Sequence, residues 1–105
     1  MDTHDIIDHI AIPVKNITRV VEWYKTRFTC ELIYQDDTWA MLRFGNIKLA
    51  FVLPAQHPPH LGFFRSDADA FGTLKTHRDG TRSTYIQDSE GNSVEILAVS
   101  RDLLK

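Results

Sequence analysis

Residues 7–14, Ile-Asp-His-Ile-Ala-Ile-Pro-Val, decide the fold. Ile10, Ile12 and Val14 alternate with smaller or polar residues, so one face of this segment is apolar and the other is not. A period of two is typical of a half-buried β-strand. The stretch therefore predicts a strand whose two faces differ in character.

The segment that follows predicts an amphipathic α-helix. Asn16 is a suitable N-cap residue, because its side chain can accept a hydrogen bond from the first turn. Apolar residues three and four positions apart form one stripe along a helix, and such a stripe packs against a core. We expect the helix to end near Thr29, with a stripe that consists of Ile17, Val20, Val21, Tyr24 and Phe28.

Short β-rich runs fill the rest of the first half. They are separated by Asp36-Asp37 and by Gly45-Asn46, which are both turn signals. The first half is therefore predicted as βαβββ, with strands over residues 31–35, 39–44 and 47–53 after the helix. Residues 54–59 contain three prolines, which cannot continue a β-ladder, so this segment is predicted to connect two halves.

The second half repeats this plan in a shorter form. The pattern around His9 recurs around His60, and Gly45-Asn46 recurs as Gly91-Asn92. We expect strands over residues 60–65, 82–88 and 93–99, a helix over about 67–75, and a polar loop over 77–81. The predicted fold class is α+β, as one domain over residues 1–105 with module one at about 6–53 and module two at about 60–99.

Composition excludes several classes of function. The 105 residues carry a formal net charge of −2 without a block of basic residues, so nucleic acid is not an expected partner. A hydrophobic share of 43% suits a folded globular chain, and no apolar run approaches the roughly 20 residues of a membrane span. Cys30 is the single cysteine, and the start of the chain does not resemble a signal peptide, so we expect a cytoplasmic protein.

His9, His60 and Glu95 are candidate metal ligands within predicted strands. Buried polar side chains need a partner, and two imidazoles with one carboxylate suit Mn²⁺, Fe²⁺, Co²⁺, Ni²⁺ or Zn²⁺. Since side chains alternate along a strand, the neighbours of these three residues should pack beneath the helices while the ligands face the other way. Those neighbours are Ile10, Ile12, Leu61, Phe63, Ile96 and Ala98.

Simpler interpretations remain open for each of these residues. His9 can be an ordinary hydrogen-bonded strand residue, His60 a loop residue after the prolines, and Glu95 a solvated position on an edge strand. The acidic stretch 88–92 is interpreted as a turn, because Gly91-Asn92 suits positive φ. Cys30 is interpreted as a structural thiol. Three histidines in terminal or loop segments, His4, His57 and His77, are interpreted as residues without a role in the site.

Three stretches together resemble the vicinal oxygen chelate superfamily. They are residues 7–14, the helix with Trp23-Tyr24, and residues 85–96, which read Tyr-Ile-Gln-Asp-Ser-Glu-Gly-Asn-Ser-Val-Glu-Ile. This superfamily includes glyoxalase I, extradiol dioxygenases, fosfomycin-resistance transferases and bleomycin-resistance proteins. The resemblance covers the chain from about residue 6 to 98.

The resemblance implies paired βαβββ modules whose sheets curl into a cup with the helices outside. It places metal ligands on the first strand of each module and on the last strand of the second, where His9, His60 and Glu95 lie. Superfamily members of this size are usually homodimers that can exchange modules. The resemblance therefore implies a homodimer in which His9 can come from one chain and His60 with Glu95 from the other.

Departures from the superfamily pattern restrict the reaction. Glyoxalase I of this superfamily uses four metal ligands, but this sequence has Leu49-Ala50 where the fourth ligand would be. Fosfomycin transferases have a threonine at the position of Ala11. Extradiol dioxygenases are usually longer and add a second-shell histidine, for which the sequence shows no convincing position.

Three further residues are candidates for substrate binding. Tyr85 is predicted opposite Glu95 in a hairpin, and Ser83 shares its face, so either can hydrogen-bond a substrate. Lys48 interrupts an apolar strand and can balance the charge of an anionic ligand. The alternative for Lys48 is an exposed position on an edge strand, and the alternative for Tyr85 is a place in the core.

The sequence thus predicts a metal-dependent enzyme that acts on a small oxygen-rich molecule by isomerisation, thiol addition or ring cleavage, with Glu95 as ligand and catalytic residue. The alternative is a metal-free binding protein of the bleomycin-resistance type.

Overall fold

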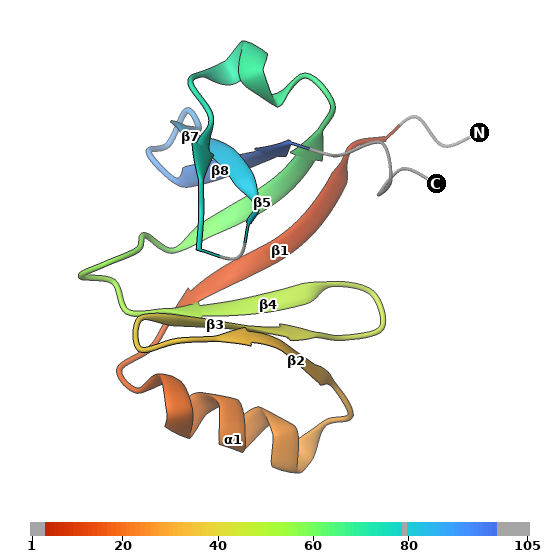
Figure 1. Cartoon of the computed structure of the whole chain (residues 1–105), viewed down its shortest axis with the longest axis vertical. Helices are drawn as coiled ribbons and strands as arrows, with labels where there is room; N and C mark the ends of the chain where they lie inside the picture. Colours follow the sequence, from red (N-terminus) through yellow and green to blue (C-terminus); the bar gives the residue numbers. More distant parts are fainter. Residues whose placement is uncertain (1–3, 79, 99–105) are drawn as a thin grey trace. The chain divides into compact units, whose positions relative to one another are not determined.

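The computed structural model describes residues 4–78 and 80–98, and it divides the chain into two compact units. The amino-terminal unit consists of residues 9–60, and the carboxy-terminal unit consists of residues 4–8 and 61–98 as far as they are described. The elements, labelled in Figure 1 where space allows, are β1 (Ile6–Pro13), α1 (Ile17–Arg27), β2 (Glu31–Gln35), β3 (Trp39–Arg43), β4 (Lys48–Val52), β5 (His60–Arg65), the 3₁₀ helix η1 (Ala68–Phe71), β6 (Lys75–Thr76), β7 (Arg82–Gln87) and β8 (Ser93–Ala98).

The amino-terminal unit is built on strands in the order β2-β3-β4-β1. β1 runs parallel to β4, and the other neighbours are antiparallel. The register between β2 and β3 is irregular between Leu32 and Tyr34, so Ile33 lies at a bulge. Leu32 and Ile33 are exposed on β2, which stands at the end of the strand order.

Helix α1 covers one face of these strands, as predicted. The side chain of Asn16 accepts a hydrogen bond from the backbone N–H of Arg19 at 2.8 Å, which confirms the predicted N-cap. Ile17 and Val21 of the helix pack with Leu42 and Phe51, both fully buried. The apolar stripe of the helix therefore forms part of the core of this unit. The helix ends at Arg27, two residues before the expected end near Thr29.

The opposite face of the same strands has a second, smaller apolar cluster. Its buried members are Ala11, Met41, Ala50 and Val52, and Trp39 packs against them. Ile12 packs with the helix-side core instead, so the two faces of β1 differ as its alternation predicted. His9 shares the face of Ala11, because residues two apart point to the same side of a strand.

The carboxy-terminal unit has the strand order β5-β8-β7-β6. β7 and β8 form an antiparallel hairpin in which Tyr85 lies opposite Glu95. The carboxylate of Asp88 accepts hydrogen bonds from the backbone N–H groups of Glu90 and Asn92, and Gly91 has φ of 85°. The acidic stretch is therefore a turn, as predicted.

The helix predicted over residues 67–75 is wrong. The chain instead forms η1, and then the short strand β6 pairs with β7. Gly72 ends η1 against β7, where an added Cβ atom would come within 2.6 Å of Thr84 Oγ1. η1 therefore ends at Gly72, and glycine is a weak helix former.

Leu61 corrects a second expectation. It was predicted to pack beneath a helix, but it is 38% exposed. The short η1 contacts β7 and β8, so it covers less of the strands than an eight- or nine-residue helix would. Ile96 on β8 is buried as expected.

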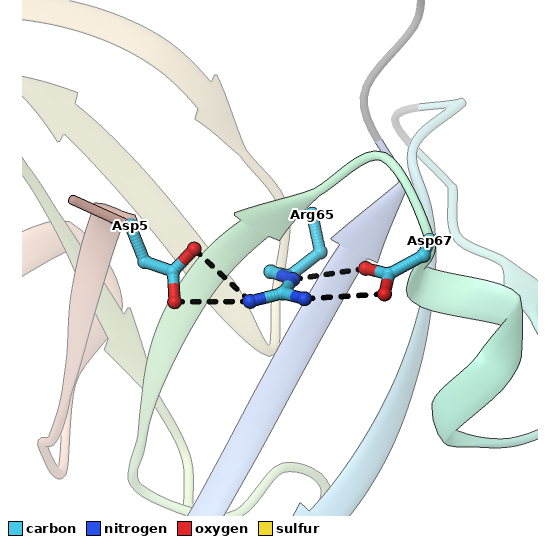
Figure 2. A network of polar contacts seen from close by, with 3 residues as sticks. All are labelled: Asp5, Arg65 and Asp67. Carbon is cyan, nitrogen blue, oxygen red and sulfur yellow. Dashed lines mark hydrogen bonds and ion pairs between the residues drawn. The ribbon is translucent and has the colours of Figure 1, made fainter. Parts of the chain in front are cut away.

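An ion-pair network joins the start of the described chain to the end of β5 (Figure 2). The guanidinium of Arg65 contacts both carboxylate oxygens of Asp5 and both of Asp67, at 2.9 to 3.1 Å. The hydrogen bond from Arg65 holds the pKa of the Asp67 carboxyl below its usual value. All three side chains are well exposed, so we expect a small contribution to stability.

The remaining strands agree with the sequence prediction to within one residue at each described end, and residues 79 and 99, which belonged to a predicted loop and strand, lie outside the described part. Within residues 4–78 and 80–98, no helix is both long and apolar enough to cross a bilayer.

We expect Leu42→Ala to destabilise the protein by about 2–5 kcal/mol, because Leu42 is fully buried and its loss leaves a cavity. Leu32→Ala is the matched control, since Leu32 is the register partner of Leu42 on β2 but is 37% exposed. Urea unfolding measures both. Equal midpoints for the two variants would contradict the assignment of the core.

Candidate functional site

The structure brings the two predicted histidine ligands together. His9 comes from β1 and His60 from the start of β5, and their Nε2 atoms lie 3.0 Å apart. The rings meet edge to face, with centroids 5.1 Å apart and an angle of 86° between the ring planes. His9 is only 3% exposed. Each imidazole therefore directs its Nε2 atom toward the Nε2 atom of the other.

The orientation of His60 is set by the proline-rich connector. Its Nδ1 lies 2.7 Å from the carbonyl oxygen of Pro58. A carbonyl only accepts, so Nδ1 carries the hydrogen, and in the neutral ring Nε2 then presents a lone pair. Pro58 thus supports the ligand tautomer of His60, as the outer partner of a metal-binding histidine usually does.

The separation of the two Nε2 atoms suits a shared cation. Imidazole nitrogens bind divalent metals at about 2.0–2.1 Å, and two such ligands at right angles are about 3 Å apart. The two nitrogen atoms, the tautomer of His60 and their spacing are therefore compatible with binding to one ion once Nε2 of His9 is also unprotonated.

Lys48 lies beside His9. The two residues are register partners of the parallel strands β4 and β1, so their side chains share a face. β4 lies between β3 and β1, which rules out the edge position that was the alternative for Lys48. Leu49 packs on the helix side, and Ala50 is buried on the His9 face, so neither adds a ligand.

Glu95 is held by hydrogen bonds within the carboxy-terminal unit. It is 5% exposed, and the hydroxyl of Ser83, which is 1% exposed, donates to its Oε2 at 2.6 Å. Glu95 therefore does not lie on a solvated edge. Ser83, predicted to contact a substrate, instead directs its one hydroxyl proton to Glu95.

His77 joins this group, although the sequence interpretation gave it no role. Its Nε2 lies 2.6 Å from Ser83 Oγ and 3.3 Å from Glu95 Oε2. The backbone N–H of His77 donates to the carbonyl of Thr81 at 2.7 Å, which closes a hairpin between β6 and β7. The signal in the sequence was the dipeptide Asp79-Gly80, a residue pair typical of hairpin turns; a hairpin predicted there places His77 on the face of Ser83.

Tyr85 also contacts Glu95. Partial burial of the phenol raises the pKa of Tyr85 well above its usual value, and the negative charge of Glu95 and a hydrogen bond to it act in the same direction. The phenol therefore stays protonated at neutral pH and can donate a hydrogen bond.

A second chain of polar contacts, in the amino-terminal unit, has similar components. His57 Nε2 lies 3.1 Å from Thr38 Oγ1, and this hydroxyl donates to Asp36 at 3.0 Å. His57 is therefore not an isolated loop residue. Although burial opposes it, hydrogen bonds from Tyr34, Thr38 and Trp39 lower the pKa of Asp36 far below its usual value of 3.8.

Comparisons with solved structures identify the fold. A methylmalonyl-CoA epimerase in complex with methylmalonyl-CoA and NH₄⁺ has a TM-score of 0.74 at 19% identity, over 92% of this chain and 96% of the other. A Streptomyces coelicolor methylmalonyl-CoA epimerase variant bound to 2-nitronate-propionyl-CoA scores 0.73 at 19% identity, over 90% and 94%. A hypothetical protein from Bacillus halodurans scores 0.71 at 14% identity, over 94% and 97%. Neither a family model nor a curated protein matches the sequence.

These likenesses extend over almost the whole of each chain, and at such identities they establish the fold. The protein is an α+β protein of the glyoxalase-like class. More specifically, it has the fold of the vicinal oxygen chelate superfamily, which confirms the resemblance seen in residues 7–14 and 85–96.

We expect Asp36→Asn to weaken the loss of stability in acid. Because the folded state lowers the pKa of Asp36, its stabilisation is complete above the usual value of 3.8 and is lost as the pH falls below it. Urea unfolding at a series of pH values below neutrality measures the slope. Asp37→Asn, at the exposed neighbour, is the control; an unchanged slope in the Asp36 variant would contradict the assignment.

Proposed function

We propose that His9, His60 and Glu95 together bind one divalent cation, and that the chain is a cytoplasmic metal-dependent enzyme of the vicinal oxygen chelate type. The observation that carries this proposal is the pair of Nε2 atoms 3.0 Å apart, with the lone pair of His60 fixed by Pro58. Two nitrogen donors and one carboxylate fit Mn²⁺, Fe²⁺, Co²⁺, Ni²⁺ or Zn²⁺. When bound, such an ion polarises substrate oxygens and stabilises the negative charge that develops on them.

The other residues of the chain have roles that suit an oxygen-rich substrate. Lys48 places a positive charge on the face of His9, where it can orient an anionic oxygen. Tyr85 stays protonated, and its phenol hydrogen-bonds Glu95. Ala11 and Ala50 are small apolar residues on the face of His9 and Lys48.

The fold favours one class of reaction over the others. Isomerisation is the first candidate, because the solved structures with this fold include methylmalonyl-CoA epimerases. An epimerisation moves a proton at a carbon next to a carbonyl, and stabilising the resulting oxyanion lowers its barrier. Thiol addition and ring cleavage of a diol are the alternatives that the same ligand set allows.

We expect the tag-free protein to bind about one equivalent of Mn²⁺, Ni²⁺ or Zn²⁺ per chain, and His60→Ala to abolish this binding, because it removes one of three ligands. Metal analysis after gel filtration measures the content. His57→Ala is the matched control, since His57 is also half-buried and bonded to a hydroxyl, but it should keep the metal.

A metal content below about 0.2 equivalents in the unaltered protein would reject the enzymatic proposal. The chain would then be a metal-free binding protein, and thermal-shift measurements with diols, thiols and α-keto acids should still show stabilisation by a ligand.

We also propose a homodimer, with a solution mass of twice the chain mass of 12.1 kDa. If the modules are exchanged, His9→Ala and Glu95→Ala chains refolded together should regain metal in part, because mixed dimers contain one intact ligand set. A monomeric mass in analytical ultracentrifugation would reject the dimer.

A further inference from the structure

The proposed function leaves a buried chain of hydrogen bonds without a role. It runs from His77 to Ser83 and on to Glu95, within the carboxy-terminal unit. We propose that His77 and Ser83 are positioning residues that hold the Glu95 carboxylate in one orientation for the metal. This inference rests on the proposed function.

Counting protons fixes the direction of each hydrogen bond. Ser83 has one hydroxyl proton, and it donates this proton to Oε2 of Glu95. Ser83 Oγ can then only accept from His77, so Nε2 of His77 carries the hydrogen. The relay is a one-way sequence, from His77 N–H to Ser83 O–H to the carboxylate.

The relay ends on one oxygen of Glu95. Oε2 accepts from Ser83 at 2.6 Å and lies 3.3 Å from His77 Nε2. The phenol of Tyr85 hydrogen-bonds the same carboxylate, so neighbours within its own unit hold Glu95. Rotation of the carboxylate would break these contacts at a position that is 5% exposed, and there water cannot easily replace them.

Holding a ligand in place before the metal arrives strengthens binding. A carboxylate that must be ordered on binding loses conformational entropy, whereas one fixed by its neighbours does not. Outer partners of metal ligands typically account for about 10- to 100-fold in metal affinity. We therefore expect His77 to act on affinity without touching the ion.

The chain contains its own control for this arrangement. His57, Thr38 and Asp36 form a comparable histidine, hydroxyl and carboxylate sequence, at 3.1 and 3.0 Å. Its carboxylate binds the backbone N–H groups of Thr38 and Trp39, so it serves a turn and not the proposed metal site. Removing His57 deletes a histidine from a similar setting while leaving Glu95 intact.

The test is isothermal titration of the metal-free, tag-free protein with Mn²⁺ or Zn²⁺. We expect His77→Ala and Ser83→Ala each to weaken binding about 10- to 100-fold, and His57→Ala to leave it unchanged. His77→Gln should recover most of the affinity, because its amide N–H lies at a similar distance from the main chain as Nε2 of histidine. His77→Leu fills similar space without a donor, so it should bind metal as weakly as His77→Ala.

A second readout does not depend on metal. In the metal-free protein, ring ¹⁵N chemical shifts should show His77 in the Nε2–H tautomer, and Ser83→Ala should change that signature. If His77→Ala does not fold, Ser83→Ala still tests the relay by this signature, and His77→Gln still tests it by metal titration.

The outcomes separate the two proposals. If the unaltered protein binds no metal, the proposed function is rejected, together with the inference that rests on it. If the unaltered protein binds metal but His77→Ala matches it within about twofold, or His77→Gln is as weak as His77→Ala, only the positioning role is overturned.

Discussion

Parallel pairing between β1 and β4 determines which face of the amino-terminal unit packs against the helix and which face carries the candidate site residues. Its register places Ile12 opposite Phe51 on the helix side, and His9 opposite Lys48 on the other side. A shift of β1 by one residue would turn His9 toward α1 and Ile12 away from it. Burying an imidazole without a partner costs free energy, so packing of the core favours the observed orientation of His9.

Much of this arrangement follows from local sequence patterns. The helix after Asn16 was predictable because its cap and its apolar spacing agree, and the turn at Gly91 because few residues tolerate positive φ. His9 was predictable as a ligand candidate because a polar residue in an apolar strand requires a reason. Each of these signals lies within about a dozen residues of chain, where periodicity and turn chemistry act directly.

The parts that sequence did not predict depend on contacts between distant residues. The apolar spacing of residues 67–75 suits one helical turn as well as a longer helix, and the turn ends at Gly72, which lies close to Thr84 of β7. His77 lies in a polar segment, and the Asp79-Gly80 pair that follows it predicts a turn but not which side chains the turn brings together. Its place beside Ser83 and Glu95 results from the pairing of β6 with β7, which a two-residue strand does not reveal.

The bulge at Ile33 has a consequence for how copies of this chain meet one another. β2 ends the strand order of its unit, and a terminal strand with exposed Leu32 and Ile33 offers a template onto which a foreign strand could add. The irregular register breaks the even spacing that such an addition needs, and the charge of Glu31 stands at the start of the strand. The irregularity thus protects the chain against aggregation through its outermost strand.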